Sequence, residues 1–149
     1  MAERTVMEFT ITIDRSPALV FDYVVDVSKH SEWSPSPFRI EGCNGPVKVG
    51  DTFSSIGVLP GDKNHRNEVT VTECSPPDRL VLDCTDHDKH FLNTFTFEAV
   101  GGGTKLTRLV DAPKPTFPLS VVFPLIKTAF INPEVNKGLA MLKANLEKT

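Results

Sequence analysis

The stretch VMEFTITIDRSPALVFDYVVD, residues 6–26, decides the fold class of this chain. Its first part alternates apolar and polar side chains, which predicts a strand with one buried face over residues 6–14. Ser16 and Pro17 then supply an N-cap residue and a proline at the first helical position. Because apolar residues recur from Val20 to Val24 at helical spacing, a short helix over residues 17–26 follows the strand directly.

The chain downstream of this stretch continues with short elements. Residues 28–33 form a second helical turn, which must end before Ser34-Pro35-Ser36-Pro37. Extended runs separated by Gly- and Pro-rich turns follow as far as residue 112. The predicted strands are residues 38–43, 51–59, 66–74, 79–86, 90–100 and 104–111. Since the gaps between them are short, neighbouring strands are expected to pair as an antiparallel meander.

The C-terminal region returns to a helical pattern. Apolar residues from Val135 to Leu146 recur on one helix face, with Asn132-Pro133 as the predicted cap and first turn. An earlier helical piece over residues 119–130 is expected to kink near Pro124. An amphipathic helix must bury its apolar face, so the C-terminal helix is expected to pack against the sheet. We therefore predict one α+β domain over residues 1–149. In it, a seven-stranded antiparallel sheet wraps around the long C-terminal helix and leaves a cavity between them.

Composition and charge narrow the class of protein. The chain has 149 residues, 40% of them hydrophobic and 23% charged, and a formal net charge of −3. An acidic balance excludes nucleic-acid binding as the default, because neutralising phosphates requires a basic surface. Cys43, Cys74 and Cys84 lack the spacing of a zinc site or a disulfide framework, which fits free thiols in the cytoplasm. The most apolar stretch, residues 117–126, is too short for stable membrane insertion.

Four sequence pieces, in their order and spacing, carry a family resemblance. The first is Ile11-x-Ile13-x-x-Ser16-Pro17-x-x-Val20-Phe21-x-x-Val24-x-Asp26 followed by Trp33. The others are Val49-Gly50-Asp51, Gly102-Gly103-Thr104-x-Leu106-Thr107 and Leu139-x-x-Leu142-Lys143-x-x-Leu146-Glu147. Together they resemble the START-like (SRPBCC) helix-grip superfamily, and within it the polyketide cyclase/dehydrase and lipid-transport branch. The resemblance implies the fold more strongly than a function, since this scaffold hosts carriers, receptors, cyclases and chaperone regulators.

Two loops are also similar to loops of the plant abscisic acid receptors in this superfamily. Gly57-Val58-Leu59-Pro60-Gly61 is similar to their gate loop, and residues 87–91 lie where their latch loop would be. The same alignment puts Glu41 where those receptors carry a ligand-binding lysine. The resemblance therefore implies mobile loops at a pocket mouth, and not recognition of the same acid.

Arg108 is the first candidate binding residue. Lys105 is expected to face water, so strand alternation points Leu106, Arg108 and Val110 inward. A guanidinium on an apolar face suits a ligand carboxylate or enolate oxygen. The alternatives are a bulge that shifts the alternation, or pairing of Arg108 with an internal acid such as Asp86.

Two asparagines and three phenylalanines are further candidates. Phe91, Phe95 and Phe97 share one strand face, which predicts core or a cavity wall. Asn93 lies among them, where its amide needs a backbone or a ligand partner. Asn67 is expected on an inner face near the cavity mouth.

Histidines lie near two turns that a meander places at the same end of the sheet. His65, His87 and His90 could therefore cluster there, with Asp86 and Asp88, as a metal site or a proton-transfer group. The alternative is two solvated polar turns. No metal site is predicted on this weak spacing, and we expect His87 and His90 to guard the cavity entrance together with the gate-loop leucine, Leu59.

Trp33 and the apolar segment over residues 117–130 allow two interpretations each. Trp33 packs under the helix pair or forms a ring over the ligand. The segment is expected to form core or a cavity lid, with a membrane-touching patch or a homodimer interface as the alternatives.

The leading functional hypothesis is binding of a hydrophobic small molecule, of aromatic, polyketide-like or lipid-like type, between the sheet and the C-terminal helix. Arg108, Asn93 and Asn67 would orient its polar end. A second hypothesis is a polyketide cyclase, aromatase or dehydratase, which the resemblance allows. A third is a protein-interaction module, such as a chaperone regulator or toxin–antitoxin component. No cofactor is expected, because the sequence has no P-loop and no dinucleotide-binding fingerprint.

Overall fold

A computed structural model describes residues 4–59, 61–87 and 89–148 of the chain. The strands are β1 (Arg4–Ile13), β2 (Phe38–Glu41), β3 (Thr52–Leu59), β4 (Asp62–Ser75), β5 (Arg79–Asp86), β6 (Lys89–Val100) and β7 (Gly103–Pro113). The helices are α1 (Pro17–Val25), the 3-10 helix η1 (Val27–Trp33), α2 (Leu119–Ile126), the π-helix η2 (Lys127–Ile131) and α3 (Asn132–Glu147).

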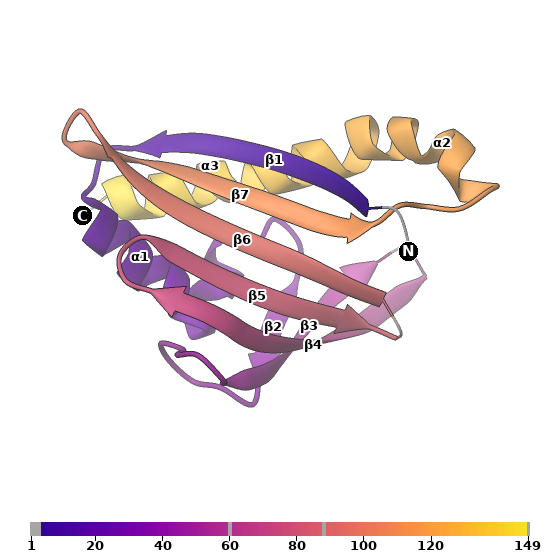
Figure 1. The fold of residues 1–149 in the computed structure, drawn as a ribbon, viewed down its shortest axis with the longest axis horizontal. Helices are drawn as coiled ribbons and strands as arrows, with labels where there is room; N and C mark the ends of the chain where they lie inside the picture. The colour runs from indigo at the N-terminus through magenta and orange to yellow at the C-terminus, as the bar shows by residue number, and fades with distance from the viewer. Residues whose placement is uncertain (1–3, 60, 88, 149) are drawn as a thin grey trace.

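The described residues form one seven-stranded antiparallel sheet in the order β1-β7-β6-β5-β4-β3-β2. Each strand from β2 to β6 pairs with the next strand along the chain, and β1 joins the edge at β7. The helix α3 runs across one face of this sheet, while α1 lies at one end of the molecule and α2 at the other (Figure 1). The predicted α+β helix-grip fold is therefore confirmed.

The turn after β1 folds as its residue types dictate. The Ser16 hydroxyl accepts a hydrogen bond from the Leu19 backbone N–H at 3.4 Å, and Pro17 begins α1. Asp26 ends α1 and caps η1 by accepting from the Ser28 N–H at 3.2 Å. The helix start predicted at residue 17 is confirmed, and the second helical turn is a 3-10 helix.

Apolar side chains pack closely on the inner face of the sheet at the end nearest α1, which we call the closed end. Ile13, Phe21, Phe97 and Leu106, which define it, are at most 4% exposed. The Phe21 and Phe97 rings meet edge to face, with centroids 5.1 Å apart. Gly103 is required here, since a Cβ at this position would lie 2.5 Å from the Ile13 carbonyl oxygen.

The chain before α3 departs from the sequence-based expectations. Asn132 does not cap a new helix, because α2, η2 and α3 follow one another without a break and Asn132 is itself helical. Helix α2 passes through Pro124, and the backbone irregularity is the π-helix that follows it. Among the described residues, no helix is both long and apolar enough to cross a bilayer.

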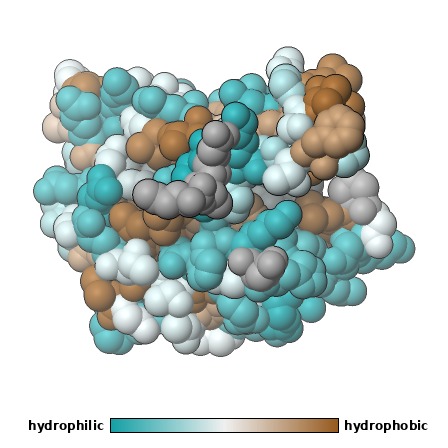
Figure 2. All heavy atoms as spheres, turned by 45° about the vertical axis from the view of Figure 1, so that its right-hand side comes forward, coloured by the Kyte–Doolittle hydropathy of each residue, from teal (hydrophilic) through white to brown (hydrophobic). Residues whose placement is uncertain are grey.

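The segment over residues 117–130 is exposed, so the expectation of core or lid is wrong for most of it. Phe117 is 81% exposed, Phe130 69% and Leu125 69%, and α2 has no buried residue. The physical reason is that α2 lies beyond the end of the sheet (Figure 1). Apolar side chains gather at the upper right of Figure 2, where α2 lies.

Candidate ligand-binding site

A cavity of about 480 Å³ lies between the inner face of the sheet, η1 and the first half of α3. That volume falls within the range of small-molecule sites. Its lining is mostly apolar, and the polar groups occupy a few positions on the strands. The lining residues are His30, Trp33, Ser34, Pro35, Phe38, Ile40, Phe53, Ser55, Leu59, His65, Asn67, Val69, Leu82, Cys84, Asp86, Phe91, Asn93, Phe95, Arg108, Val110, Glu134, Val135 and Gly138.

Arg108 projects from β7 into this cavity with an amide as its hydrogen-bond partner. Its Nε and Nη2 donate to Asn93 Oδ1 at 3.1 and 2.9 Å, and its guanidinium lies 5.5 Å from the centre of the Phe95 ring. No acidic side chain among the described residues is within ion-pair distance of it, so the predicted alternative of an Asp86 partner is wrong. Burial lowers the pKa of Arg108, yet a guanidinium stays charged at neutral pH.

The amide of Asn93 connects this cation to a thiol. Asn93 accepts from Arg108 and donates from Nδ2 to Cys84 Sγ at 3.5 Å. Burial raises the pKa of Cys84, although Asn93 and Arg108 act in the opposite direction. The thiol is therefore protonated at neutral pH, and the cluster carries one positive charge.

Trp33 and His30 form the wall contributed by η1. Trp33 is 7% exposed, its ring meets Phe95 edge to face, and its buried Nε1 donates to no described atom. His30 Nε2 lies 2.7 Å from the Val24 carbonyl oxygen, so it carries the proton, and desolvation lowers the pKa of His30 to about 4. Trp33 therefore packs against the core and also lines the cavity.

Polar groups at the far end of the cavity join the β3–β4 and β5–β6 hairpins. His65 Nε2 lies 2.9 Å from Asp86 Oδ2, and His65 Nδ1 lies 3.2 Å from Asp62 Oδ2. Desolvation lowers the pKa of His65, but its hydrogen bonds to Asp62 and Asp86 outweigh this effect, and the net shift is upward. Both ring nitrogens face carboxylates, which favours the imidazolium.

Seven of the ten predicted ligand-contacting residues lie on the cavity wall. These are Trp33, Leu59, Asn67, Phe91, Asn93, Phe95 and Arg108. The other three do not. Phe97 faces inward but lies at the closed end beneath Phe21, while His87, on the turn, is 89% exposed. His90 faces outward, where its Nδ1 lies 3.1 Å from Asp83 Oδ1.

The three histidines that could cluster come together only in part. The His65 and His87 rings are 6.5 Å apart, but His90 is held separately by Asp83 and Thr85. Asp88 lies outside the described residues. Within the described ranges, no three His, Cys, Asp or Glu side chains gather closely enough to hold a metal ion.

Sequence reasoning did not assign Cys84 and His30 to the cavity wall, and it placed His65 and Asp86 only in a possible cluster at the cavity rim. The missing signal for His65 was the start of β4, predicted at residue 66 and found at Asp62. With β4 extended, strand alternation places His65 on the same face as Asn67 and Val69. Cys84 and Asp86 follow Leu82 by the same alternation on β5.

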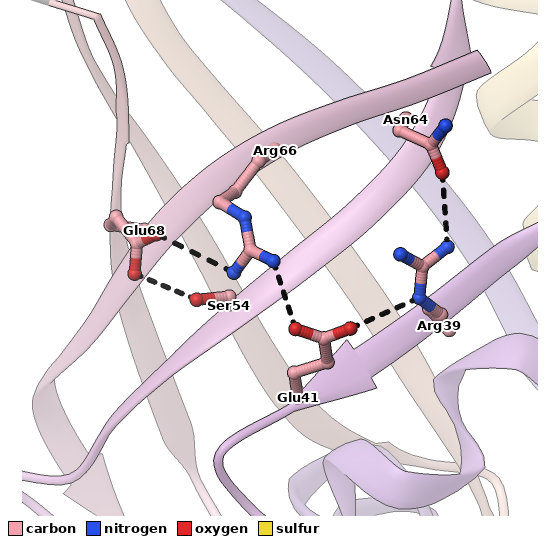
Figure 3. Close-up of polar contacts among 6 residues, drawn as sticks. All are labelled: Arg39, Glu41, Ser54, Asn64, Arg66 and Glu68. Atoms are coloured by element: carbon pink, nitrogen blue, oxygen red, sulfur yellow. Dashed lines mark hydrogen bonds and ion pairs between the residues drawn. The ribbon is translucent and has the colours of Figure 1, made fainter.

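Glu41, aligned with the receptor lysine, lies on the opposite face of the sheet. It pairs with Arg66 at 2.8 Å and Arg39 at 3.2 Å, in a polar network that continues to Glu68, Ser54 and Asn64 (Figure 3). Its neighbours in β2, Phe38 and Ile40, point the other way and line the cavity. The outer network is solvated, and it contributes nothing to the site.

Comparison with solved structures shows the same fold in proteins of low sequence identity. Protein CV1439 from Chromobacterium violaceum has a TM-score of 0.72 at 16% identity, with 95% of this chain and 96% of that chain covered. TTHA0849 from Thermus thermophilus has a TM-score of 0.74 at 13% identity, with 97% and 98% covered. Ara h 8.0201 has a TM-score of 0.73 at 16% identity, with 99% and 100% covered. No curated protein matches the chain by sequence.

A match between the sequence of this chain and a protein family is more direct evidence than the shared fold. Residues 4–147 match the family described as polyketide cyclase / dehydrase and lipid transport. This match covers every strand and helix described above, and with the solved folds it confirms the helix-grip resemblance of the four sequence pieces. The chain therefore belongs to the polyketide cyclase/dehydrase and lipid-transport family.

Proposed function

We propose that this protein binds a hydrophobic small molecule with an acidic end, and that Arg108 pairs with the acid. The ligand is a fatty acid-like or aryl carboxylate, or a polyketide with an enolate oxygen. The family and the fold support hydrophobic ligand binding. The single observation that supports the acidic end is the Arg108 guanidinium, which faces the cavity without an acidic partner among the described residues.

The electrostatic argument rests on what burial does to a charge. Removing a cation from water costs several kcal/mol unless a counter-charge compensates it, and proteins usually supply one. Asn93 supplies only a neutral acceptor to Arg108, although Arg has five N–H donors. A carboxylate would accept from the remaining donors, and an oxygen placed near Trp33 would also accept from its Nε1, which has no partner among the described residues.

The apolar part of the ligand would be held by the remaining wall. Phe38, Phe53, Phe91 and Val110 present ring and aliphatic surface around the cavity. Burial there contributes about 25 cal/mol per Å² before the cost of ordering the ligand. Affinity would therefore come mainly from these side chains, and orientation from Arg108.

The test measures binding of dodecanoate and 2-naphthoate to the wild type and to Arg108→Met. Calorimetry gives the affinity, and thermal shift gives the change in melting temperature. We expect at least one acid to raise the melting temperature of the wild type. For Arg108→Met we expect an affinity at least about tenfold lower, because a hydrogen-bonded charge contributes roughly 1.5–3 kcal/mol. Arg39→Met, on the outer face, is the matched control and should bind like the wild type.

Two results would contradict the proposal. One is that neither acid shifts the melting temperature of the wild type. The other is that Arg108→Met binds both acids as tightly as the wild type and the Arg39→Met control do. The uncharged dodecanol separates the contributions, since it should bind both proteins equally.

A cyclase or dehydratase activity is the second candidate, because His65 and Asp86 line the same cavity as Arg108. A general base needs an available lone pair, and both His65 nitrogens face carboxylates. His30 also lines the cavity, but its pKa of about 4 makes it a weak base. Neither histidine of the cavity wall is therefore a ready general base. Identical product mixtures from a polyketide synthase supplied with wild type or Arg108→Met would exclude Arg108-dependent catalysis.

A further inference from the structure

The cavity carries opposite charges at its two ends. Arg108 lies over Phe95, toward the packed part of the molecule. The other end carries Asp86 in the lining, with Asp62 behind His65. Asp62 and Asp86 both contact the one imidazolium of His65, so the local charge is negative. His87 adds a second imidazole 3.7 Å from Asp86, but it is 89% exposed.

Asp86 also has an unused acceptor. Its Oδ2 lies 2.9 Å from His65 Nε2, whereas its Oδ1 is buried, lies 3.7 Å from His87 Nε2 and has no partner within hydrogen-bond distance among the described residues. A buried carboxylate oxygen without a donor is unfavourable, because the group has lost water without replacement. Since Asp86 is one of the lining residues, this oxygen is an acceptor within the wall of the cavity.

The register of the sheet gives the separation of the two polar ends. Arg108 donates to Asn93 of β6, and Asp86 pairs with Lys89 at the start of the same strand. The rise from Lys89 to Asn93 along an extended strand is about 13 Å between backbone positions. A ligand that reaches both side chains therefore lies along the strands.

We propose that the ligand is bipolar: an acidic head lies at Arg108, and a hydrogen-bond donor at the opposite end, a hydroxyl or an ammonium, binds Asp86 Oδ1. This inference rests on the proposed function, since it assumes the acidic head. The new element is that the end of the ligand opposite the acidic head, its tail, is also polar. A wholly apolar tail would leave Asp86 Oδ1 without a partner, and a second carboxylate would meet the charge of Asp86.

The test compares three probes that share one chain: dodecanoate, ω-hydroxydodecanoate and dodecanedioate. Calorimetry on the wild type at neutral pH should give ω-hydroxydodecanoate about fivefold to tenfold tighter than dodecanoate. Dodecanedioate should bind at least about tenfold more weakly than dodecanoate. In an apolar pocket the hydroxyl would instead weaken binding, because an unpaired buried hydroxyl costs about 1–3 kcal/mol.

Two variants on β5 assign the effect to Asp86. Asp86→Asn removes the charge, so the hydroxyl preference should fall below about twofold and the diacid penalty should disappear. Asp83→Asn is the matched control. It lies on the same strand with its side chain on the outer face, paired with His90, and should keep the wild-type order of the three probes.

The outcomes separate this inference from the proposed function. If dodecanoate binds in an Arg108-dependent way but the hydroxyl brings no gain, the polar tail site is wrong and the acidic head site stands. The same holds if Asp86→Asn keeps the wild-type preference. If no acid binds the wild type, both proposals fail.

Discussion

The two ends of β6 and β7 share one inner face and yet differ in what fills them. At the closed end, Phe97 and Leu106 pack beneath Phe21 of α1 and are almost fully buried. At the other, open end, defined by Phe91, Asn93, Arg108 and Val110, the same face borders the cavity. Strand alternation is identical in both, so the difference comes from the helices above. Helix α1 covers one end only, and no described residue of α2 or η2 lines the cavity.

Truncating one phenylalanine at each end would give the largest contrast. Phe97→Ala should lower the free energy of unfolding by about 3–5 kcal/mol, because it leaves a void among packed side chains. Phe91→Ala should cost only about 1 kcal/mol, since its ring already borders open space. Urea denaturation measures both. Equal losses would mean that the open end is packed as tightly as the closed end.

A pH titration tests His30, which lies where the two ends meet. Its pKa in the folded protein is about 4, below the ordinary value of 6.5, so the unfolded chain binds the proton first as the pH falls. Stability should therefore decline from about pH 6.5 and lose about 3 kcal/mol by pH 4.

His30→Gln, which keeps an N–H donor, should flatten this decline, and the exposed His87→Gln should not. His65 does not account for the slope, because its pKa is raised. Its stabilisation is fully present below the unfolded pKa and is lost only as the pH rises through the folded pKa. A decline of the same size in His30→Gln would show that carboxylates cause it.

Gly138→Ala should give the smallest effect on stability. It tests how closely α3 packs against η1, where the two ends meet. A Cβ at this position would lie 3.0 Å from the Trp33 carbonyl oxygen, where α3 crosses η1. The helix-propensity gain of about 1 kcal/mol should be cancelled by this contact, with a net loss below about 1 kcal/mol. Lys137→Ala, on the exposed face, is the control. A clear gain in melting temperature would show that Trp33 moves easily.

Much of the fold follows from local sequence signals. Ser16-Pro17 predicted the start of α1, and the limits of β5 were predicted to the residue. Arg108 was predicted to face inward because Leu106 and Val110 flank it with the same alternation. These predictions succeeded because cap chemistry and strand alternation depend on near neighbours.

The sequence-based predictions that failed concern features that tertiary contacts decide. Phe97 has the same alternation as Phe91 and Phe95, and only the position of α1 along the sheet decides that it is core. The inward orientation of His65 depends on the β3–β4 register, which pairs it with Gly57. Asn132 has the residue type of a cap, but the helix before it continues through a π-turn that no local signal indicated.

The sheet has two edges, and the outer network of Figure 3 lies at one of them. An edge strand can pair with a strand of another molecule, which is a common route to aggregation. Here β2 has only four residues, and its outward side chains are Arg39 and Glu41. At the other edge, Lys143 Nζ donates to the Thr12 carbonyl oxygen at 2.7 Å. Charged side chains therefore restrict both edges, and copies of this protein should resist joining edge to edge at high concentration.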